Sequence, residues 1–401
     1  MKFDFAIIGG GVMGLSLGLK LLEHSSSLKV VILEKESNFG EHASGRNSGV
    51  LHSGIYYNPD SLKAKFCKIG NLEIKKICKS ENLFLNECGK VIVSQDSKED
   101  TELFRIANRA RKNNIDIEIL EKKYLQKFEA KAKTNDYFIW SPSTAVVSPR
   151  EIINHLKSKF VKYGGRFELH REVSIKESNS ELYINQKGIS ANFIINAAGG
   201  GALKIAKKLG VGTEFSMLPI MGSYLVNKEH ENFNFNSLIY PVPNPVNPFL
   251  GVHLTLNSNN QIKIGPSAIP TLGGYQYGIK PNFEVKDISE IIKCIKALYL
   301  SKSINLKNLV RTEFPNMHKN VMISKAQQLI NIPLKVDQWE WHSSAIRSQL
   351  IDLTLKKFEY DFVIKNYLNS THLLNVVSPG FTCSIPFSEW IISNNILTSN
   401  S

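Results

Sequence analysis

The sequence of 401 residues lacks the features that mark several specialised classes of protein. Its five cysteines are widely spaced and form no C-x-x-C pair, which argues against a disulfide framework or a metal site and favours a reducing compartment. No apolar run reaches the roughly 18 residues of a membrane-spanning helix. Because Met1 leads directly into an apolar strand pattern, we also expect no signal peptide and a cytoplasmic location.

The sequence has little acidic charge relative to basic charge, and its net charge is +13. The lysines are scattered, and no compact arginine-rich motif with interleaved aromatic residues occurs, which argues against nucleic-acid binding. The charge fits an anionic substrate, or peripheral contact with an anionic surface such as an inner membrane. A chain of this length can bury large cores, and we expect two domains that can be interleaved.

The first thirty-five residues carry the strongest motif. An apolar run with β-branched residues, 4–8, predicts a buried parallel strand and leads directly into a G-x-G-x-x-G at 9–14. The periodicity of 15–22 predicts a helix, and a second predicted strand, 29–33, ends at Glu34. This context predicts a dinucleotide-binding βαβ unit. The alternative is a glycine turn in some other α/β protein.

Each part of this motif has a physical role in holding a dinucleotide. Gly9 allows the tight turn, Gly11 lets a pyrophosphate approach the backbone, and Gly14 lets the helix pack close to the strand. The helix N-terminus offers N–H groups to the phosphates, and Glu34 can accept hydrogen bonds from a ribose diol but would repel a 2′-phosphate. Many flavoproteins begin with this motif, which favours FAD over NAD. The expected contacts are Gly9, Gly11, Val12, Met13, Gly14, Glu34 and Lys35.

A polar, glycine-containing stretch follows at 43–57. Its small residues would let the backbone lie against a flat ligand, and three of its side chains can donate to phosphate. The alternative is a solvated loop, but several aliphatic residues and two tyrosines make the stretch too apolar for a free surface. The expected cofactor contacts are Ser44, Arg46, Asn47, Ser48 and Val50.

Five segments carry a resemblance to a known family. They are SGRNSGVLHSGIYYNPDSLKAKFCKIGN (44–71), CGKVIV (88–93), LIYPVPNPVNPFLGVHLT (238–255), IGPSAI (264–269) and AIRSQ (345–349). Through them the chain resembles the L-2-hydroxyglutarate oxidase/dehydrogenase family, within the D-amino-acid-oxidase-like FAD-dependent oxidoreductases. The likeness extends over most of the chain.

This resemblance implies FAD as cofactor and the oxidation of a 2-hydroxy acid, in the first place L-2-hydroxyglutarate to 2-oxoglutarate, with oxygen or a quinone as electron acceptor. One alternative is oxidation of an amino acid or a secondary amine on the same fold. Another is a flavoprotein subunit that mainly docks to partners or a membrane. The chain departs from the family pattern P-F-R-G-[DE]-Y, because residues 219–224 read PIMGSY and lack its arginine and its acidic residue.

We therefore predict an α/β fold with a Rossmann-like FAD-binding domain that is discontinuous. It would comprise 1–80, 145–215 and 340–401, and an inserted, mainly β-sheet substrate domain of α+β type would comprise 81–144 and 216–339. Helices are predicted at 62–79, 99–114, 124–129, 150–163, 202–209, 284–300 and 380–392. Strands are predicted at 166–175, 182–184, 193–196, 224–226, 237–240, 251–256, 261–264, 360–364 and 373–376, with a hairpin turn at 257–260.

Two further groups of residues are expected to contact FAD. The resemblance implies backbone contacts of Val173 with adenine, and the small residues Ala198 and Gly199, after a predicted strand, permit close packing against FAD. It also implies that the turn before the last helix places N–H groups against the pyrimidine end of the flavin, where they stabilise negative charge. A plain helix cap is the alternative there. The residues of this turn are Pro379, Gly380 and Thr382.

The oxidation of a 2-hydroxy acid requires a carboxylate site and a base. Arg347 offers the bidentate guanidinium, and it matches the carboxylate arginine of amino-acid-oxidising relatives, although it could be a surface arginine. His52 and His253 are the candidate bases, with His253 preferred, although a lone histidine is more often structural. Tyr240 can hydrogen-bond the carboxylate. Lys63 could serve a distal carboxylate, although such lysines usually form a solvated helix face.

Overall fold

The structure is a computed structural model. It describes residues 1–173, 175–178, 181–184, 188–228, 233–244, 249–259, 261–273, 285–302, 304–342 and 344–396. Parts of five predicted features lie outside these ranges: Ser174 of the strand 166–175, residues 245–248 of the long motif, Asn260 of the hairpin turn, Glu284 of the helix 284–300 and Ser343 beside the arginine motif.

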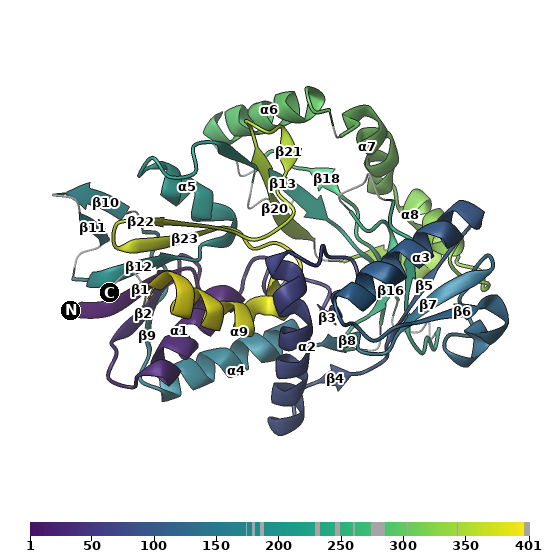
Figure 1. The fold of residues 1–401 in the computed structure, drawn as a ribbon, viewed down its shortest axis with the longest axis horizontal. Helices are drawn as coiled ribbons and strands as arrows, with labels where there is room; N and C mark the ends of the chain where they lie inside the picture. Colours follow the sequence, from purple (N-terminus) through teal and green to yellow (C-terminus); the bar gives the residue numbers. More distant parts are fainter. Residues whose placement is uncertain are drawn as a thin grey trace.

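A six-stranded, largely parallel sheet forms the first half of the molecule (Figure 1). Strand β1 lies between β2 and β12 and is parallel to both. Its run of apolar residues is typical of a parallel strand, which is covered on both faces. Only β22 runs antiparallel to its neighbour β23. In spatial order the strands are β22 (Val363–Tyr367), β23 (Ser370–Asn375), β12 (Ser190–Asn196), β1 (Lys2–Ile8), β2 (Val30–Leu33) and β9 (Arg166–Glu168).

Helices cover one face of this sheet. Helix α1 (Val12–His24) packs against α4 (Pro149–Lys162) and α9 (Gly380–Ile391), and α9 also packs against α2 (Leu62–Ser80) (Figure 1). Their apolar side chains join those of alternate strand residues, such as Phe5, in one buried core. The opposite face buries a smaller core under the hairpin of β10 (Ile175–Ser178) and β11 (Glu181–Ile184).

An eight-stranded sheet forms the second half, and its strands come from three separate parts of the chain. Strands β5 and β15 are parallel, and the other neighbours are antiparallel. In order they are β19 (Trp339–Trp341), β14 (Leu225–Asn227), β17 (Ile262–Gly265), β16 (His253–Leu256), β15 (Leu238–Pro241), β5 (Lys90–Val93), β7 (Tyr137–Ser141) and β6 (Glu118–Glu121). Helices α3 (Ser97–Lys112) and α8 (Lys319–Gln327) contribute to its core.

Two smaller sheets lie between these halves. One joins β3 (Val50–Leu51), β8 (Ala145–Val147) and β4 (Leu85–Asn86), and the other joins β18 (Ile269–Pro270), β13 (Phe215–Gly222), β20 (Ala345–Asp352) and β21 (Lys357–Phe358). Helices α5 (Ala202–Lys207), α6 (Val285–Tyr299) and α7 (Leu306–Glu313) complete the longer elements. None of the helices in the described ranges is long and apolar enough to cross a membrane.

The predicted α/β fold is confirmed, and most predicted elements lie within a few residues of their expected positions. The predicted strand 166–175 is wrong, because it ends at Glu168. The chain turns there, since His170 has a φ of +55° and the N–H groups of His170 and Arg171 bind the carbonyls of Glu36 and Glu34. The expected helix at 124–129 is a 3-10 turn at Lys122–Lys127. The domain boundaries stay a prediction.

Candidate active site

The glycines of the N-terminal motif sit where larger residues do not fit. Gly9 has a φ of +109°, and a Cβ atom there would lie 2.5 Å from the Ala197 carbonyl oxygen. A Cβ atom on Gly14 would overlap the Gly9 carbonyl. At Gly11 an added Cβ would meet only the Ser44 side chain, at 2.9 Å, so this position keeps open backbone at the start of α1. These residues fit a bound pyrophosphate.

Glu34 lies at the end of β2 and is buried, as the dinucleotide prediction requires. Its carboxylate accepts hydrogen bonds from the N–H groups of Gly10 at 2.7 Å and Glu36 at 3.0 Å. These bonds fix its orientation and leave lone pairs that can accept from a ribose. Its neighbour Lys35 forms an ion pair with Glu36 at 3.4 Å.

The stretch 43–57 is ordered by its own hydrogen bonds. The Ser44 hydroxyl accepts from the Val12 N–H at 3.0 Å, which places it at the N-terminus of α1, next to Met13. Arg46 donates to the Glu41 carbonyl at 2.7 Å, and Asn47 donates to the Ser44 carbonyl at 2.6 Å. Two of the expected phosphate donors, Arg46 and Asn47, therefore form hydrogen bonds within the loop.

The rest of this stretch leads into the second half of the molecule. The Ser48 hydroxyl accepts from the N–H of Val50, which begins β3. Ser48 also acts on Tyr224, whose pKa is raised by burial and lowered by Ser48. Of the expected middle contacts, Ala198 lies beside the glycine motif, because an added Cβ on Gly9 would be 3.0 Å from the Ala198 Cα atom. Val173 is buried against the β1–β2 side of the sheet, and Ala198 and Gly199 follow β12 directly.

The turn before α9 meets His52. The backbone N–H of His52 donates to the Thr382 hydroxyl at 3.3 Å, and its Nε2 atom lies 3.5 Å from the Ser378 hydroxyl. Pro379 is the N-cap of α9 and Gly380 is its first residue. The structure therefore brings the predicted pyrimidine-end residues and one predicted base together.

Lys63 is buried, with 4% of its surface exposed, so its reading as a solvated face is wrong. The start of α2 is turned inward because the Leu62 and Lys63 N–H groups both donate to the Asp361 carboxylate, at 2.8 and 3.1 Å. The Lys63 ammonium donates to the Ser378 carbonyl at 3.0 Å. Burial, and then the nearby Arg347, lower the pKa of Lys63 to about 7.

Arg347 lies on β20 and is partly buried, so it is not a freely exposed surface arginine. Its Nε atom is buried and has no hydrogen-bond partner among the described residues, and its guanidinium carbon lies 5.6 Å from the centroid of the Phe249 ring. Burial lowers its pKa, while Tyr57 and Tyr360 act in the opposite direction. A buried guanidinium N–H without a partner is costly unless it meets an anion, so Arg347 fits a carboxylate site.

His253 and Tyr240 form a stacked pair on neighbouring strands of the eight-stranded sheet. Their ring centroids are 3.9 Å apart, and both side chains are at least 95% buried. The His253 Nδ1 atom lies 2.8 Å from the Gly251 carbonyl oxygen. Burial lowers the pKa of both His253 and His52 to about 3, and Lys90 adds to the effect on each. Both imidazoles are therefore neutral near pH 7.

Lys90 lies next to the candidate site, close to Tyr240, although its sequence context does not single it out. It is 1% exposed, and its Nζ atom lies 4.7 Å from the Tyr56 ring centroid and 4.8 Å from that of Tyr240. Its signal in the sequence was a lysine at the start of the apolar strand of CGKVIV, a segment noted only for its resemblance. Burial lowers the pKa of Lys90 to about 7.

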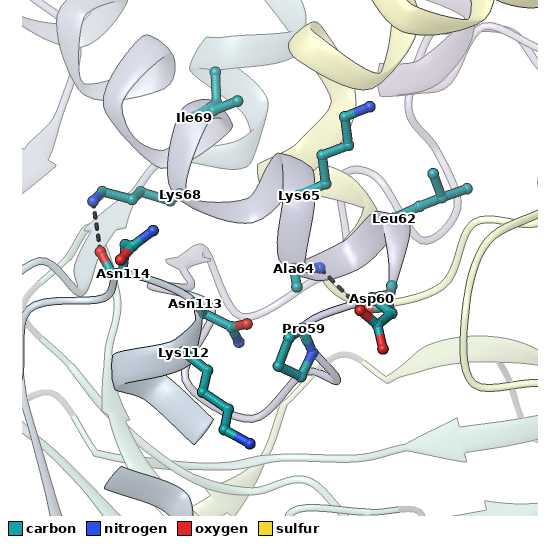
Figure 2. A pocket seen from close by; sticks show the side chains of 11 residues that line it. Pro59, Asp60, Leu62, Ala64, Lys65, Lys68, Ile69, Lys112, Asn113 and Asn114 are labelled. Atoms are coloured by element: carbon teal, nitrogen blue, oxygen red, sulfur yellow. Dashed lines mark hydrogen bonds between the residues drawn. The ribbon is translucent and has the colours of Figure 1, made fainter. Parts of the chain in front are cut away.

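A separate groove of about 450 Å³ lies between the start of α2 and the end of α3 (Figure 2). Its charged lining includes Asp60, Lys65, Lys68 and Lys112, and the Lys68 ammonium donates to the Asn114 carbonyl at 2.6 Å. It contains none of the residues predicted to contact cofactor or substrate, so it is not part of the candidate active site.

The fold and the glycine motif define a dinucleotide-binding oxidoreductase. The chain belongs to the family of FAD-dependent oxidoreductases, whose profile matches residues 4–386, and its cofactor is FAD. It is similar to the L-2-hydroxyglutarate dehydrogenase of Salmonella houtenae, with 31% identity over 404 residues that cover 98% of this chain and 92% of that protein. The resemblance expected from the sequence is therefore confirmed.

Two further proteins extend this comparison. The mitochondrial L-2-hydroxyglutarate dehydrogenase of Caenorhabditis briggsae is 31% identical over 415 residues, covering 98% of this chain and 93% of that protein. Among solved structures, the dithionite-reduced L-α-glycerophosphate oxidase of Mycoplasma pneumoniae with FAD bound superposes with a TM-score of 0.73. It is 20% identical and covers 98% of this chain and 95% of that chain, so this likeness concerns the fold.

Proposed function

We propose that the protein oxidises an L-2-hydroxy acid, in the first place L-2-hydroxyglutarate, to the 2-oxo acid. The names of its relatives support this substrate. The observation that carries the proposal is the arrangement around His52. The Lys63 ammonium donates to the Ser378 carbonyl at 3.0 Å, and the His52 Nε2 atom lies 3.5 Å from the Ser378 hydroxyl. Arg347 acts electrostatically on Lys63, and His253 does so on His52. A cationic site for a carboxylate and the neutral imidazole of His52 therefore lie next to the turn that begins α9.

Arg347 would bind the carboxylate next to the reacting carbon. Its fork of N–H donors suits the two oxygens of a carboxylate, and its buried Nε has no competing partner among the described residues. Lys63 adds positive charge on the same side. A bound carboxylate would neutralise this positive charge. The charge is costly while the site is empty, so binding of an anion is favourable here.

His253 would take the hydroxyl proton of the substrate. A carbonyl oxygen only accepts hydrogen bonds, so the Nδ1 atom carries the proton toward Gly251 and the Nε2 atom keeps its lone pair. FAD, when bound, accepts the hydride that leaves C2 of the substrate. The product is then the 2-oxo acid, with one proton on His253 and two electrons on the cofactor.

The N-terminus of α9 would favour the reduced, negatively charged state of the cofactor. Backbone N–H groups at a helix N-terminus carry partial positive charge. The Thr382 hydroxyl accepts from the His52 N–H, which holds this turn and His52 in a fixed relative position. The electron acceptor, oxygen or a quinone, and contact with a membrane surface stay predictions.

A steady-state panel tests the proposed function. The purified holoenzyme would be assayed with an artificial electron acceptor and L-2-hydroxyglutarate, its D-enantiomer, L-lactate, glycine and sarcosine. We expect the highest kcat/KM with L-2-hydroxyglutarate, with 2-oxoglutarate as the product. A higher kcat/KM with glycine or sarcosine would instead support oxidation of amines and would overturn the proposal.

A further inference from the structure

Lys90 is a buried cation without an acidic partner. Its side chain is 1% exposed, and no carboxylate of the described residues forms an ion pair with it. Its surroundings are the two aromatic rings of Tyr56 and Tyr240. Cation–π contacts offset only part of the cost of removing an ammonium group from water. Such a group needs an anion from outside the chain if it is to remain charged.

Lys90 lies on the same face of the eight-stranded sheet as the stacked rings of Tyr240 and His253. Lys90 lies opposite Leu238 in the parallel register of β5 and β15, so Tyr240, two residues further on, points to the same face. His253 lies on the next strand, stacked on Tyr240. Lys90, Tyr240 and His253 therefore form a row across three adjacent strands.

The described site holds two separate centres of positive charge. The Lys63 ammonium donates to the Ser378 carbonyl next to α9 and lies 5.6 Å from the Phe362 ring centroid. The Lys90 ammonium instead lies over the Tyr56 and Tyr240 rings, at the eight-stranded sheet. The two ammonium groups therefore share none of these neighbours, and they belong to different elements, α2 and β5. This arrangement offers one cationic centre to each end of an elongated dianion.

We propose that Lys90 binds the distal carboxylate of a 2-hydroxy dicarboxylate, while Arg347 binds the carboxylate beside the reacting carbon. This inference rests on the proposed function and adds the residue that selects a dicarboxylate over a monocarboxylate. The Tyr56 hydroxyl, buried and without a partner among the described residues, can donate a second hydrogen bond. Lys63 is the less suitable distal residue, because it lies beside Arg347 and already donates to Ser378.

The test compares two substrates of equal chain length, L-2-hydroxyglutarate and L-2-hydroxypentanoate, in wild type and Lys90→Met. Methionine fills a similar volume without charge. We expect Lys90→Met to lower kcat/KM about 100-fold for the dicarboxylate and less than about threefold for the monocarboxylate. The dissociation constants of 2-oxoglutarate and 2-oxopentanoate, measured from the perturbation of the flavin absorbance, should change in the same ratio.

A second buried lysine provides a matched control. Lys263 is 9% exposed on β17, in the same sheet, and its Nζ atom lies 5.8 Å from the Tyr224 ring centroid. Lys263→Met should leave the preference for the dicarboxylate unchanged. Lys63→Met should weaken both substrates alike, because it acts beside Arg347.

The outcomes separate this inference from the proposed function. If wild type does not oxidise L-2-hydroxyglutarate, the proposed function fails. If wild type does so and Lys90→Met keeps the full preference for the dicarboxylate, only the role of Lys90 is overturned. Equal losses with both substrates would also overturn it, because Lys90 would then act on the reaction or the fold. If Lys90→Met does not fold, Lys90→Gln is tested by the same ratio.

Discussion

The imidazole of His253 stacks on the ring of Tyr240 with centroids 3.9 Å apart and an interplanar angle of 19°. The Gly251 carbonyl accepts from its Nδ1–H group, which fixes the tautomer. The Nε2 atom of His253 is therefore ready to accept a proton. His52 is held through its backbone by Thr382, and its Nε2 atom is only 3.5 Å from the Ser378 hydroxyl. The Nε2 atom of His253 thus has a defined lone pair, whereas that of His52 faces a hydroxyl of the protein, and this favours His253 as the base.

Replacing each histidine by asparagine distinguishes the two candidates. We expect His253→Asn to lower kcat about 1,000-fold, within the range for loss of a general base, and His52→Asn to lower it about tenfold. Because the pKa of both histidines is lowered to about 3, neither should add a step near pH 6.5 to kcat in wild type, whereas Lys63 and Lys90, with pKa values of about 7, affect substrate binding. Stopped-flow reduction of the flavin measures this directly. The reverse order of losses would identify His52 as the base.

Gly11→Ala tests the cofactor site without disturbing the fold. The added methyl group would meet only the Ser44 side chain, so α1 and its strand should pack as before. It would, however, occupy the space through which a pyrophosphate approaches the backbone. We expect a folded protein by circular dichroism with at least about tenfold weaker FAD binding.

A glycine outside the site controls for the loss of glycine itself. Gly164 has a φ of +88° and nothing within 4 Å of an added Cβ atom. Gly164→Asn should keep its FAD, since asparagine tolerates this backbone region. Full FAD content in Gly11→Ala would show that the dinucleotide does not approach this glycine.

Arg347→Lys keeps the positive charge but removes the paired N–H donors of the guanidinium. We expect kcat/KM to fall about 100-fold for any 2-hydroxy acid, because a single ammonium cannot form the two parallel hydrogen bonds of a guanidinium. Arg105→Lys is the control, since Arg105 is 70% exposed and pairs with Glu102. Steady-state kinetics measure both variants. A change of less than threefold in Arg347→Lys would remove Arg347 from the carboxylate site.

The preference for a dicarboxylate should depend on pH through Lys90. Its pKa is lowered to about 7 by burial, and only the protonated form attracts the distal carboxylate. The ratio of the dissociation constants of 2-oxopentanoate and 2-oxoglutarate should therefore be highest below about pH 7 and fall by up to about tenfold per pH unit above it. Lys63, whose pKa is also about 7, affects both ligands alike and cancels in the ratio.

The two histidines and the two tyrosines around this part of the site do not titrate in this window. His52 and His253 are neutral there, since their pKa values are lowered to about 3, and burial raises the pKa of Tyr56 and Tyr240. Lys90→Met should remove the pH dependence of the ratio. A ratio that stays constant in wild type from about pH 6 to pH 9 would contradict the role of Lys90.

Local patterns predicted the nucleotide-binding half well. The strand, glycine motif, helix and terminal acid at Glu34 form a contiguous unit, and each signal depends on neighbours in the sequence. The prediction of a strand at 166–175 was wrong because His170 adopts a positive φ, which a histidine does not by itself predict. The end of β9 depends instead on hydrogen bonds to residues far away in the sequence, such as Glu36.

The second half of the site could be predicted only in part. Motif resemblance selected His253, Tyr240 and Arg347, but it could not show that Lys63 turns inward. That orientation depends on Asp361, about three hundred residues away, which binds the first turn of α2. Lys90 was missed because burial of a lysine is rare, and a lysine at the edge of an apolar strand is usually exposed.

The most direct test of the central claim is an anaerobic titration of the purified holoenzyme with L-2-hydroxyglutarate, followed by absorbance in the flavin band. We predict complete loss of the oxidised flavin spectrum at one equivalent of substrate per flavin, with one equivalent of 2-oxoglutarate formed. An oxidised spectrum that persists in excess substrate, with FAD bound, would contradict the account. It would direct attention to residues 219–224, where the family's arginine and acidic residue are absent.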